Sequence, residues 1–289
     1  MHTKLQNLTK LDSINNTVFI GKVLYHFEEL PSTNTYASEL LSETTNLGEN
    51  IEHDEIPNTF GTEGPLDGVV VSTFNQTYGR GQMGSRWESE PNMNLAVSII
   101  LKPHFLQARQ QFHLNKAIAL AVCDFVSDQY ADANPSLKNE VTVKWANDIY
   151  VKNNKIAGIL IQNTLSGVDI QSTIIGIGLN INQTHFNNLP NATSLKLETK
   201  KTYNLREMLG KLCVFVEQRY LQLKKREFDK LHKEYLDKLY RMGEDAIYQY
   251  PNGDYFSGRI IGVGENGKLT VLTKSGVENF DVKEVKFVQ

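Results

Sequence analysis

The stretch QTYGRGQMGSRWESEPNMN, residues 76–94, joins two apolar runs that are typical of β-strands. It groups Gly79, Arg80 and Gly81. Glycine lets the backbone adopt positive φ and approach a ligand closely. Backbone N–H groups beside a guanidinium form a concave anion site. The stretch therefore predicts a mobile loop that wraps a carboxylate or phosphate, and a solvated basic hairpin loop is the alternative.

The segments upstream of this loop predict a strand and a helix. Val23, Tyr25 and Phe27 alternate with polar residues, as in a half-buried strand. Helical spacing begins after Ser32-Thr33-Asn34. These side chains suit the capping of a helix, and they could also hold a polar ligand. Residues 42–67 contain seven acidic residues and no Lys or Arg, and they predict an acidic insertion loop on the surface.

The segments downstream predict a mixture of strands and helices. Apolar spacing in residues 107–129 and 204–240 indicates helices. Short strands are expected around a polar turn in 141–151, and further strands in 155–161 and 173–182. After Gly243, turn residues recur between short apolar runs, which predicts a small β-barrel.

The predicted architecture is α+β, with a mixed β-sheet flanked by helices. We expect an N-terminal extension over residues 1–22, loosely held to about residue 16, because it is polar. A catalytic domain is expected over 23–242 and the small β-barrel over 243–289.

The composition is that of a globular protein. Hydrophobic residues make up 40% and charged residues 22% of the 289. The net charge of -3 provides no overall attraction for DNA or an anionic membrane. No apolar run approaches a membrane span, and the first residues lack the apolar core of a signal peptide. We therefore expect a cytoplasmic protein in which Cys123 and Cys213 are buried thiols.

Two further polar groups suggest chemistry on a phosphate. Lys144 and Asn147-Asp148 lie in a polar turn, and Lys155 lies in an otherwise apolar strand. A buried lysine is costly without an anion, although a salt bridge to an acid would also satisfy it. With Arg80, these lysines could neutralise phosphate charge, while Asp148 helps to hold Mg²⁺ or positions a nucleophile. The common nucleotide-binding signatures are missing from the sequence.

The motifs resemble those of the biotin protein ligases, which are also called biotin–[acetyl-CoA-carboxylase] ligases. The resemblance spans nearly the whole chain from Val23 and includes the small C-terminal domain. Four matches occur in the family's order: Ser32-Thr33-Asn34, Gly79-Arg80-Gly81 through Trp87 to Asn94-Leu95, Lys144-Trp145-x-Asn147-Asp148 with Lys155-x-x-Gly158-Ile159-Leu160, and Gly176-Ile-Gly178-Leu-Asn180-Ile-Asn182.

The resemblance implies a class II aminoacyl-tRNA-synthetase-like catalytic domain with an SH3-like C-terminal barrel. It also implies a two-step acyl transfer with ATP, biotin and Mg²⁺. The biotin carboxylate attacks the α-phosphorus of ATP, which gives biotinyl-5′-AMP and pyrophosphate. A lysine of a biotin carboxyl carrier protein then attacks this anhydride and releases AMP. The resemblance implies no DNA and no membrane partner, and it leaves a homodimer open.

The resemblance also assigns roles to single residues. Lys155, Arg80 and Asp148 would be catalytic, with Asp148 also near Mg²⁺. Ser32, Thr33 and Gln76 would bind the ureido ring of biotin. Trp87 and Asn180 would lie beside the adenine nucleotide. Gly158 and Gly178 would let biotin approach the backbone closely. The implied binding set is Ser32, Thr33, Asn34, Gln76, Gly79, Arg80, Gly81, Gln82, Trp87, Lys144, Asn147, Lys155, Gly158, Gly178 and Asn180.

The sequence departs from the family's usual pattern at several positions. Gln82, Met83 and Ser85 stand where arginine is frequent, so we expect the loop to retain the adenylate less tightly. Ala146 replaces the usual proline, which predicts a less rigid turn.

Three rival functions are alternatives to this one. A lipoate–protein ligase or octanoyltransferase shares the fold and a catalytic lysine. A biotin-responsive repressor needs a DNA-binding head, which the expected extension is too short to supply. A non-catalytic binding module is disfavoured by Lys155 and Asp148.

Overall fold

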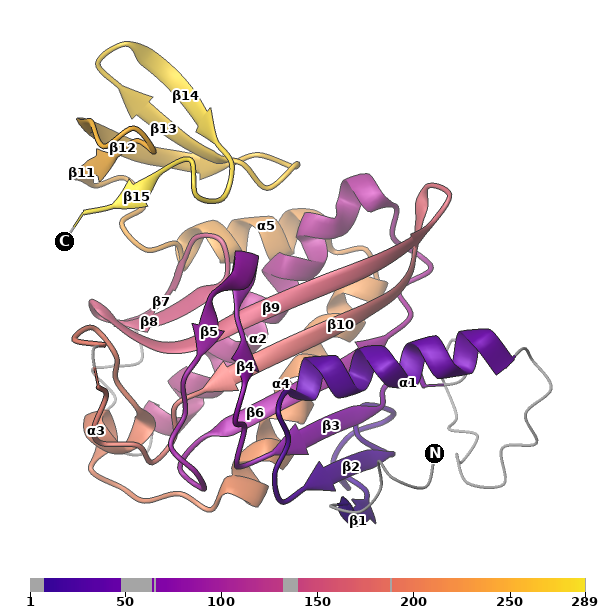
Figure 1. Ribbon diagram of the computed structural model, residues 1–289. Coiled ribbons are helices and arrows are strands. Elements are labelled where there is room, and N and C mark those ends of the chain that lie inside the picture. Colours follow the sequence, from indigo (N-terminus) through magenta and orange to yellow (C-terminus); the bar gives the residue numbers. More distant parts are fainter. Residues whose placement is uncertain (1–7, 48–63, 65, 132–139, 188, 289) are drawn as a thin grey trace.

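A computed structural model describes residues 8–47, 64, 66–131, 140–187 and 189–288 (Figure 1). Within these residues, an eight-stranded sheet has the strand order β1-β2-β3-β6-β10-β9-β8-β7. β2 and β3 are parallel, whereas the other neighbouring pairs are antiparallel. The predicted mixed sheet is therefore confirmed. Its strands are β1 (Leu8–Asp12), β2 (Leu24–Phe27), β3 (Val70–Thr73), β6 (Leu95–Leu101), β7 (Val141–Lys144), β8 (Asp148–Val151), β9 (Asn154–Ser166) and β10 (Asp169–Leu179).

Helices cover both faces of this sheet. α1 packs on β3, β6 and β10, while α2 contacts α4, α5 and the strands β7 to β9 (Figure 1). Side chains alternate across a strand, so β6 is apolar on both faces. Ile99 of β6 faces the larger core and Ile100 faces α1. The helices are α1 (Thr33–Leu47), α2 (Gln111–Ala131), α3 (Leu195–Thr199), α4 (Leu205–Lys224) and α5 (Phe228–Asp237).

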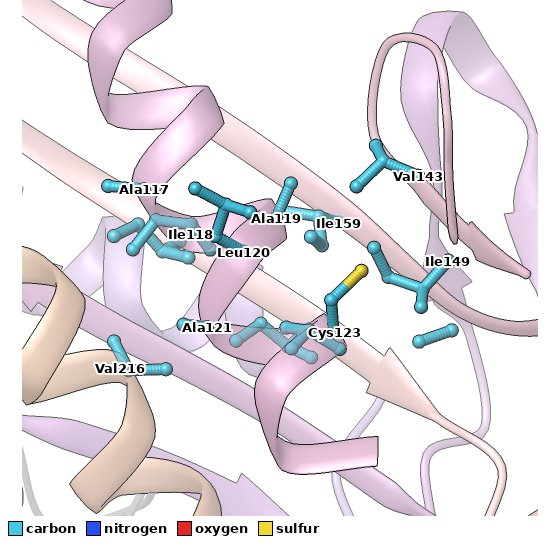
Figure 2. Packing of buried hydrophobic residues seen from close by; sticks show 14 of the residues in the cluster. Ala117, Ile118, Ala119, Leu120, Ala121, Cys123, Val143, Ile149, Ile159 and Val216 are labelled. Atoms are coloured by element: carbon cyan, nitrogen blue, oxygen red, sulfur yellow. The ribbon is translucent and has the colours of Figure 1, made fainter. Parts of the chain in front are cut away.

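The larger core lies between α2 and the sheet. Figure 2 shows Leu120 and Cys123 of α2 beside Ile149 and Ile159 of the strands, with Val216 of α4 nearby. Cys123 and Cys213 are both free and buried, as predicted. Burial raises the pKa of the Cys123 thiol to about 12, so this thiol stays protonated and unreactive.

A second, five-stranded antiparallel sheet follows, and we call it the C-terminal sheet. Its strand order is β14-β13-β12-β11-β15. This sheet confirms the predicted small β-domain, while the domain boundaries at residues 22 and 242 stay predictions. Its strands are β11 (Asp245–Gln249), β12 (Tyr255–Val263), β13 (Leu269–Thr273), β14 (Gly276–Phe280) and β15 (Lys286–Phe287).

Three local predictions were wrong in part. Residues 8–12 form edge strand β1, paired with β2, although we expected a loosely held segment. The single helix expected over 204–240 is two helices, because Arg226 adopts a left-handed φ of 59° between α4 and α5. Residues 42–47 continue α1 instead of starting the insertion loop. Most of the remaining insertion, 48–63 and 65, lies outside the described residues.

No helix among the described residues is long and apolar enough to cross a membrane.

Candidate active site

A cleft of about 280 Å³ opens where the eight-stranded sheet, the loop after β3 and the C-terminal sheet meet. Thirteen predicted site residues line it: Ser32, Thr33, Asn34, Gln76, Arg80, Gly81, Gln82, Trp87, Asn147, Asp148, Lys155, Gly158 and Gly178. Gly79, Lys144 and Asn180 do not line this cleft. Its size and mixed polar and apolar walls suit a small organic ligand.

A buried polar cluster forms one end of the cleft, at the start of α1. The Thr33 backbone N–H donates to Gln76 Oε1 at 3.0 Å. Asn34 Nδ2 donates to Gln162 Oε1 at 3.2 Å, and Asn34 Oδ1 lies 2.5 Å from the Ser98 hydroxyl. From the described residues, Ser32 Oγ accepts a single long bond of 3.4 Å, from the Thr35 N–H. Capping is therefore a weak role for Ser32, and its hydroxyl is available to a ligand.

Two glycines of β10 leave room for neighbouring side chains at the floor of the cleft. A Cβ at Gly176 would overlap the Asn34 amide, since Cγ and Nδ2 of Asn34 lie 2.9 Å from its position. A Cβ at Gly178 would lie 2.6 Å from Trp87 Cδ2. The group that lies against Gly178 is the Trp87 indole.

The glycine-arginine stretch forms a short ribbon over the cleft. β4 (Gly79–Arg80) pairs with β5 (Arg86–Trp87) around a 3₁₀ turn at Gln82–Gly84. The Gly81 N–H donates to the Ser85 carbonyl at 2.7 Å and closes the turn. Arg86 stacks 4.4 Å from the Tyr78 ring centroid. Arg80 is exposed and forms no ion pair with a described residue, so its charge is available to an anion.

Lys155 and Asp148 form an ion pair in the wall of the cleft. Lys155 Nζ lies 2.7 Å from Asp148 Oδ1, and the two side chains are 34% and 31% exposed. They come from neighbouring antiparallel strands, β9 and β8. Lys155 Nζ also lies 5.7 Å from the centroid of the Trp87 ring. The salt bridge expected as an alternative is present, and it holds the ammonium group at the cleft surface.

Lys144 lies against the C-terminal sheet instead of in the cleft. Its Nζ lies 3.1 Å from the Tyr150 hydroxyl and 5.2 Å from the Phe287 ring centroid. Burial lowers the pKa of Lys144, while the Asp148 charge opposes the shift. In this structure Lys144 therefore supports the wall that carries Asp148.

Asn147 and Asn180, two of the three predicted asparagines, make mainly backbone contacts. Asn147 Nδ2 donates to the Ile159 carbonyl, which ties the β7–β8 turn to β9. Asn180 Nδ2 donates to the Thr193 carbonyl at 2.9 Å. Asn180 Oδ1 is buried and lacks a hydrogen-bond partner among the described residues. Asn180 lines a second hollow of about 240 Å³, which shares Trp87 and Lys155 with the cleft.

The fit of the cleft to a metal ion depends on its carboxylates. Asp148 is the one carboxylate that lines it among the described residues, and these contain no group of three metal-binding side chains. Mg²⁺ commonly binds through one or two carboxylates together with substrate phosphates. The donors present therefore fit Mg²⁺ that arrives with a nucleotide.

Sequence reasoning missed several residues of the site. Ser98 is fully buried on β6, and its hydroxyl contacts Thr33 and Asn34. Ser98 is a polar residue within the otherwise apolar run of β6, and this sequence feature could have identified it. Val282 and Lys283 of the C-terminal sheet's last loop also line the cleft. Nothing local in the sequence marks that loop as part of the site.

The chain is similar to known proteins in sequence and in fold. Residues 56–180 match the model of the biotin/lipoate A/B protein ligase family. The chain is 25% identical over 218 residues to the bifunctional ligase/repressor BirA of Bacillus spizizenii, covering 73% of this chain. It spans 64% of that relative's length. It is also 26% identical over 204 residues to the biotin–[acetyl-CoA-carboxylase] ligase of Mycobacterium tuberculosis, covering 71% of this chain and 73% of that relative.

The solved structures include a biotin protein ligase from Aquifex aeolicus in complex with biotin and ATP. It superimposes with a TM-score of 0.67 over 92% of this chain and 98% of that one, at 24% identity, and so shares the fold. The fold is therefore that of the biotin/lipoate A/B protein ligase family, whose model matches residues 56–180. Within that class, the relatives and solved structures named above include a biotin–[acetyl-CoA-carboxylase] ligase and a biotin protein ligase.

Proposed function

We propose that this protein is an ATP-dependent biotin protein ligase. It activates biotin to biotinyl-5′-AMP and transfers the biotinyl group to a lysine of a biotin carboxyl carrier protein. The proposal rests on one observation: a single cleft brings the Ser32–Asn34 cluster, the Arg80 ribbon and the Lys155–Asp148 pair together. The names of two relatives, both biotin–[acetyl-CoA-carboxylase] ligases, support it.

The polar cluster suits the ureido ring of biotin. The ring presents N–H donors and a carbonyl acceptor, and the hydroxyls of Ser32 and Thr33 can donate or accept. Gln76 is already held by the Thr33 N–H. Because Ser32 and Thr33 are nearly buried, a ligand that left their hydroxyls unpaired would bind poorly.

The cations suit the reacting end of biotin. In the first step, two anions must approach, because the biotin carboxylate attacks the α-phosphate. Lys155 lies where its ammonium can contact both, and Asp148 orients it through the 2.7 Å ion pair. Mg²⁺ bound with the ATP phosphates would neutralise further charge there, and Asp148 and Asn147 are the residues that would hold it.

The ribbon between β4 and β5 suits a cover for the intermediate. An acyl-adenylate hydrolyses readily, so water must be excluded until the acceptor lysine arrives. Arg80 and the backbone of Gly81 line the cleft from the ribbon's side. Closing of this ribbon over the adenylate is part of the proposal.

The proposal extends to setting and partners. A carboxylase's biotin carrier domain is the acceptor, in line with the names of the relatives. We further propose that the protein acts in the cytoplasm and binds neither DNA nor membrane. A homodimer is also part of the proposal, and sedimentation at several concentrations would detect it.

The test is transfer of labelled biotin to a purified carrier domain with ATP and Mg²⁺. We expect label on the carrier lysine, and biotin-dependent exchange of pyrophosphate into ATP without the carrier. Lipoate and octanoate serve as rival substrates in the same exchange assay. Exchange that depends on lipoate instead of biotin, or no exchange with either, would overturn the proposal.

A further inference from the structure

The turn between β7 and β8 carries two of the cleft's polar residues and is held mainly by contacts from outside. The Tyr235 hydroxyl of α5 donates to the Ala146 carbonyl at 3.3 Å. The Ile159 N–H of β9 donates to the Asn147 carbonyl at 3.0 Å. Trp145 Nε1 donates to the Gly267 carbonyl at 2.9 Å. This last bond comes from the C-terminal sheet, 122 residues away in sequence.

Gly267 lies in the turn between β12 and β13 and is seated on the catalytic domain. Its φ is +87°, a conformation that favours glycine. A Cβ there would lie 2.6 Å from Cδ2 and 2.9 Å from Cγ of the Phe112 ring. Phe112 belongs to the first turn of α2 and is nearly buried. The turn therefore docks with its backbone directly against Phe112, while its carbonyl receives the Trp145 indole.

Trp145 joins this docking contact to the cleft. The residue is only 8% exposed, and it lines the cleft beside Ala146 and Asn147. Asp148 follows at the start of β8 and pairs with Lys155. A displaced indole would move the turn and, with it, the carboxylate that orients the Lys155 ammonium.

We propose that Trp145 is a positioning residue through which the docked Gly267 turn holds the Asn147–Asp148 segment in register with Lys155. The C-terminal sheet thus acts on the reaction through this contact, in addition to the wall formed by Val282 and Lys283. The reaction in question is the proposed one, so the inference rests on the proposed function.

The matched pair Gly267→Ala and Gly253→Ala tests the inference. Both glycines lie in turns of the C-terminal sheet with positive φ, +87° and +97°, so both substitutions strain the backbone. Only Gly267 meets the catalytic domain, because no heavy atom lies within 4 Å of a Cβ at Gly253. Trp145→Phe replaces the indole with a smaller ring that has no N–H donor, so it probes the same contact without overpacking.

Two readouts are needed: steady-state adenylation kinetics, and hydrogen exchange of residues 143–149. For Gly267→Ala and Trp145→Phe we expect faster exchange in this segment and a loss of adenylation kcat on the order of 10- to 100-fold. Biotin affinity without ATP should fall much less than kcat, because the Ser32–Asn34 cluster at the start of α1 does not depend on this turn. Gly253→Ala should resemble the unaltered protein in both readouts.

Two results would overturn the inference. One is that Gly267→Ala and Trp145→Phe match Gly253→Ala in exchange and kinetics. The other is that biotin affinity falls as much as kcat, which would indicate a general loss of structure. An unaltered protein without biotin-dependent pyrophosphate exchange would instead overturn the proposed function, and hydrogen exchange would then decide the role of Trp145 alone.

Discussion

Single residues in the cleft acquire their roles from the neighbours that the fold gives them. The sequence allowed Lys155 to be either a cation in a structural salt bridge or a cation that binds a ligand. In the structure it is ion-paired with Asp148 and lies at the surface of the cleft. Gly178 was predicted to let a ligand approach the backbone, and the group that lies against it in the structure is the Trp87 indole. Side-chain identity limits what each residue can do, while position decides what it meets.

The first prediction concerns Lys155. Lys155→Ala should slow adenylate formation by on the order of 10²- to 10³-fold, because a charge placed at the reacting phosphate is lost. Pyrophosphate exchange with saturating biotin and ATP measures it. Lys152→Asn is the control, since Lys152 is exposed in the adjacent hairpin and asparagine tolerates its φ of 54°. A nearly normal rate in Lys155→Ala would contradict the role.

The second prediction concerns Gly178. Gly178→Ala should displace the indole, because its Cβ would lie 2.6 Å from Trp87 Cδ2. We expect a destabilisation of about 1–3 kcal/mol from overpacking, together with a shift in tryptophan emission. Urea unfolding and fluorescence measure these effects. Gly262→Ala in β12 meets no heavy atom within 4 Å and serves as the control. Equal stability of the two variants would refute the prediction.

At the scale of elements, the ribbon and the N-terminal segment differ in how far sequence could describe them. The glycine-rich stretch was found from its composition alone, and it forms the expected connection between strands. The expectation for the N-terminal segment rested on its polarity, which does not reveal contacts with residues far away in the chain. Glu217 of α4 accepts hydrogen bonds from the backbone N–H groups of Val18, Phe19 and Ile20.

The third prediction concerns the ribbon. Gln82 lines the cleft at the start of the 3₁₀ turn. Gln82→Arg would add a cation near the adenylate, so release of biotinyl-5′-AMP should slow by about two- to tenfold. Dissociation of preformed adenylate in a chase experiment measures this rate. Lys283→Gln, in the C-terminal sheet's loop at the cleft, is a comparison that removes a cation. An unchanged or faster release from Gln82→Arg would count against the expectation.

The fourth prediction concerns the contact between α4 and the N-terminal segment. The Glu217 carboxylate is nearly buried and accepts the three N–H groups at 2.6 to 2.9 Å. Glu217→Gln removes the charge and places an NH₂ group against at least one of these N–H donors, so stability should fall by about 2–4 kcal/mol. Urea unfolding measures it. The exposed Glu207 on the same helix, paired with Lys211 at 3.3 Å, provides Glu207→Gln as a nearly neutral control.

At the scale of the whole molecule, the junction of the two sheets contains a buried amine. Lys116 of α2 is 1% exposed, and its Nζ lies 5.3 Å from the Phe112 ring centroid. Burial lowers the pKa of Lys116 to about 8, and Glu265 of the C-terminal sheet opposes this shift. The charged form is therefore costly in the folded protein at neutral pH.

The fifth prediction follows from the sign of this shift. Between about pH 8 and the ordinary lysine pKa of 10.5, the unfolded chain binds the extra proton, so stability rises with pH in that window. Lys116→Met should stabilise the protein by about 1–3 kcal/mol at pH 7, and the gain should shrink toward pH 10. Urea unfolding at both pH values measures it. A gain that does not change with pH would contradict the assignment.

The sequence by itself determined the local elements and most of the site. Hydrophobic periodicity predicted the strands around residues 141–161, and the motifs predicted most cleft residues, because both signals are carried by neighbours in the chain. Only the tertiary structure decided that Lys144 lies against the C-terminal sheet, that Ser98 contacts Asn34 of the polar cluster, and that Trp145 meets Gly267. These contacts join segments that are distant in sequence, and the packing of helices and sheets brings them together.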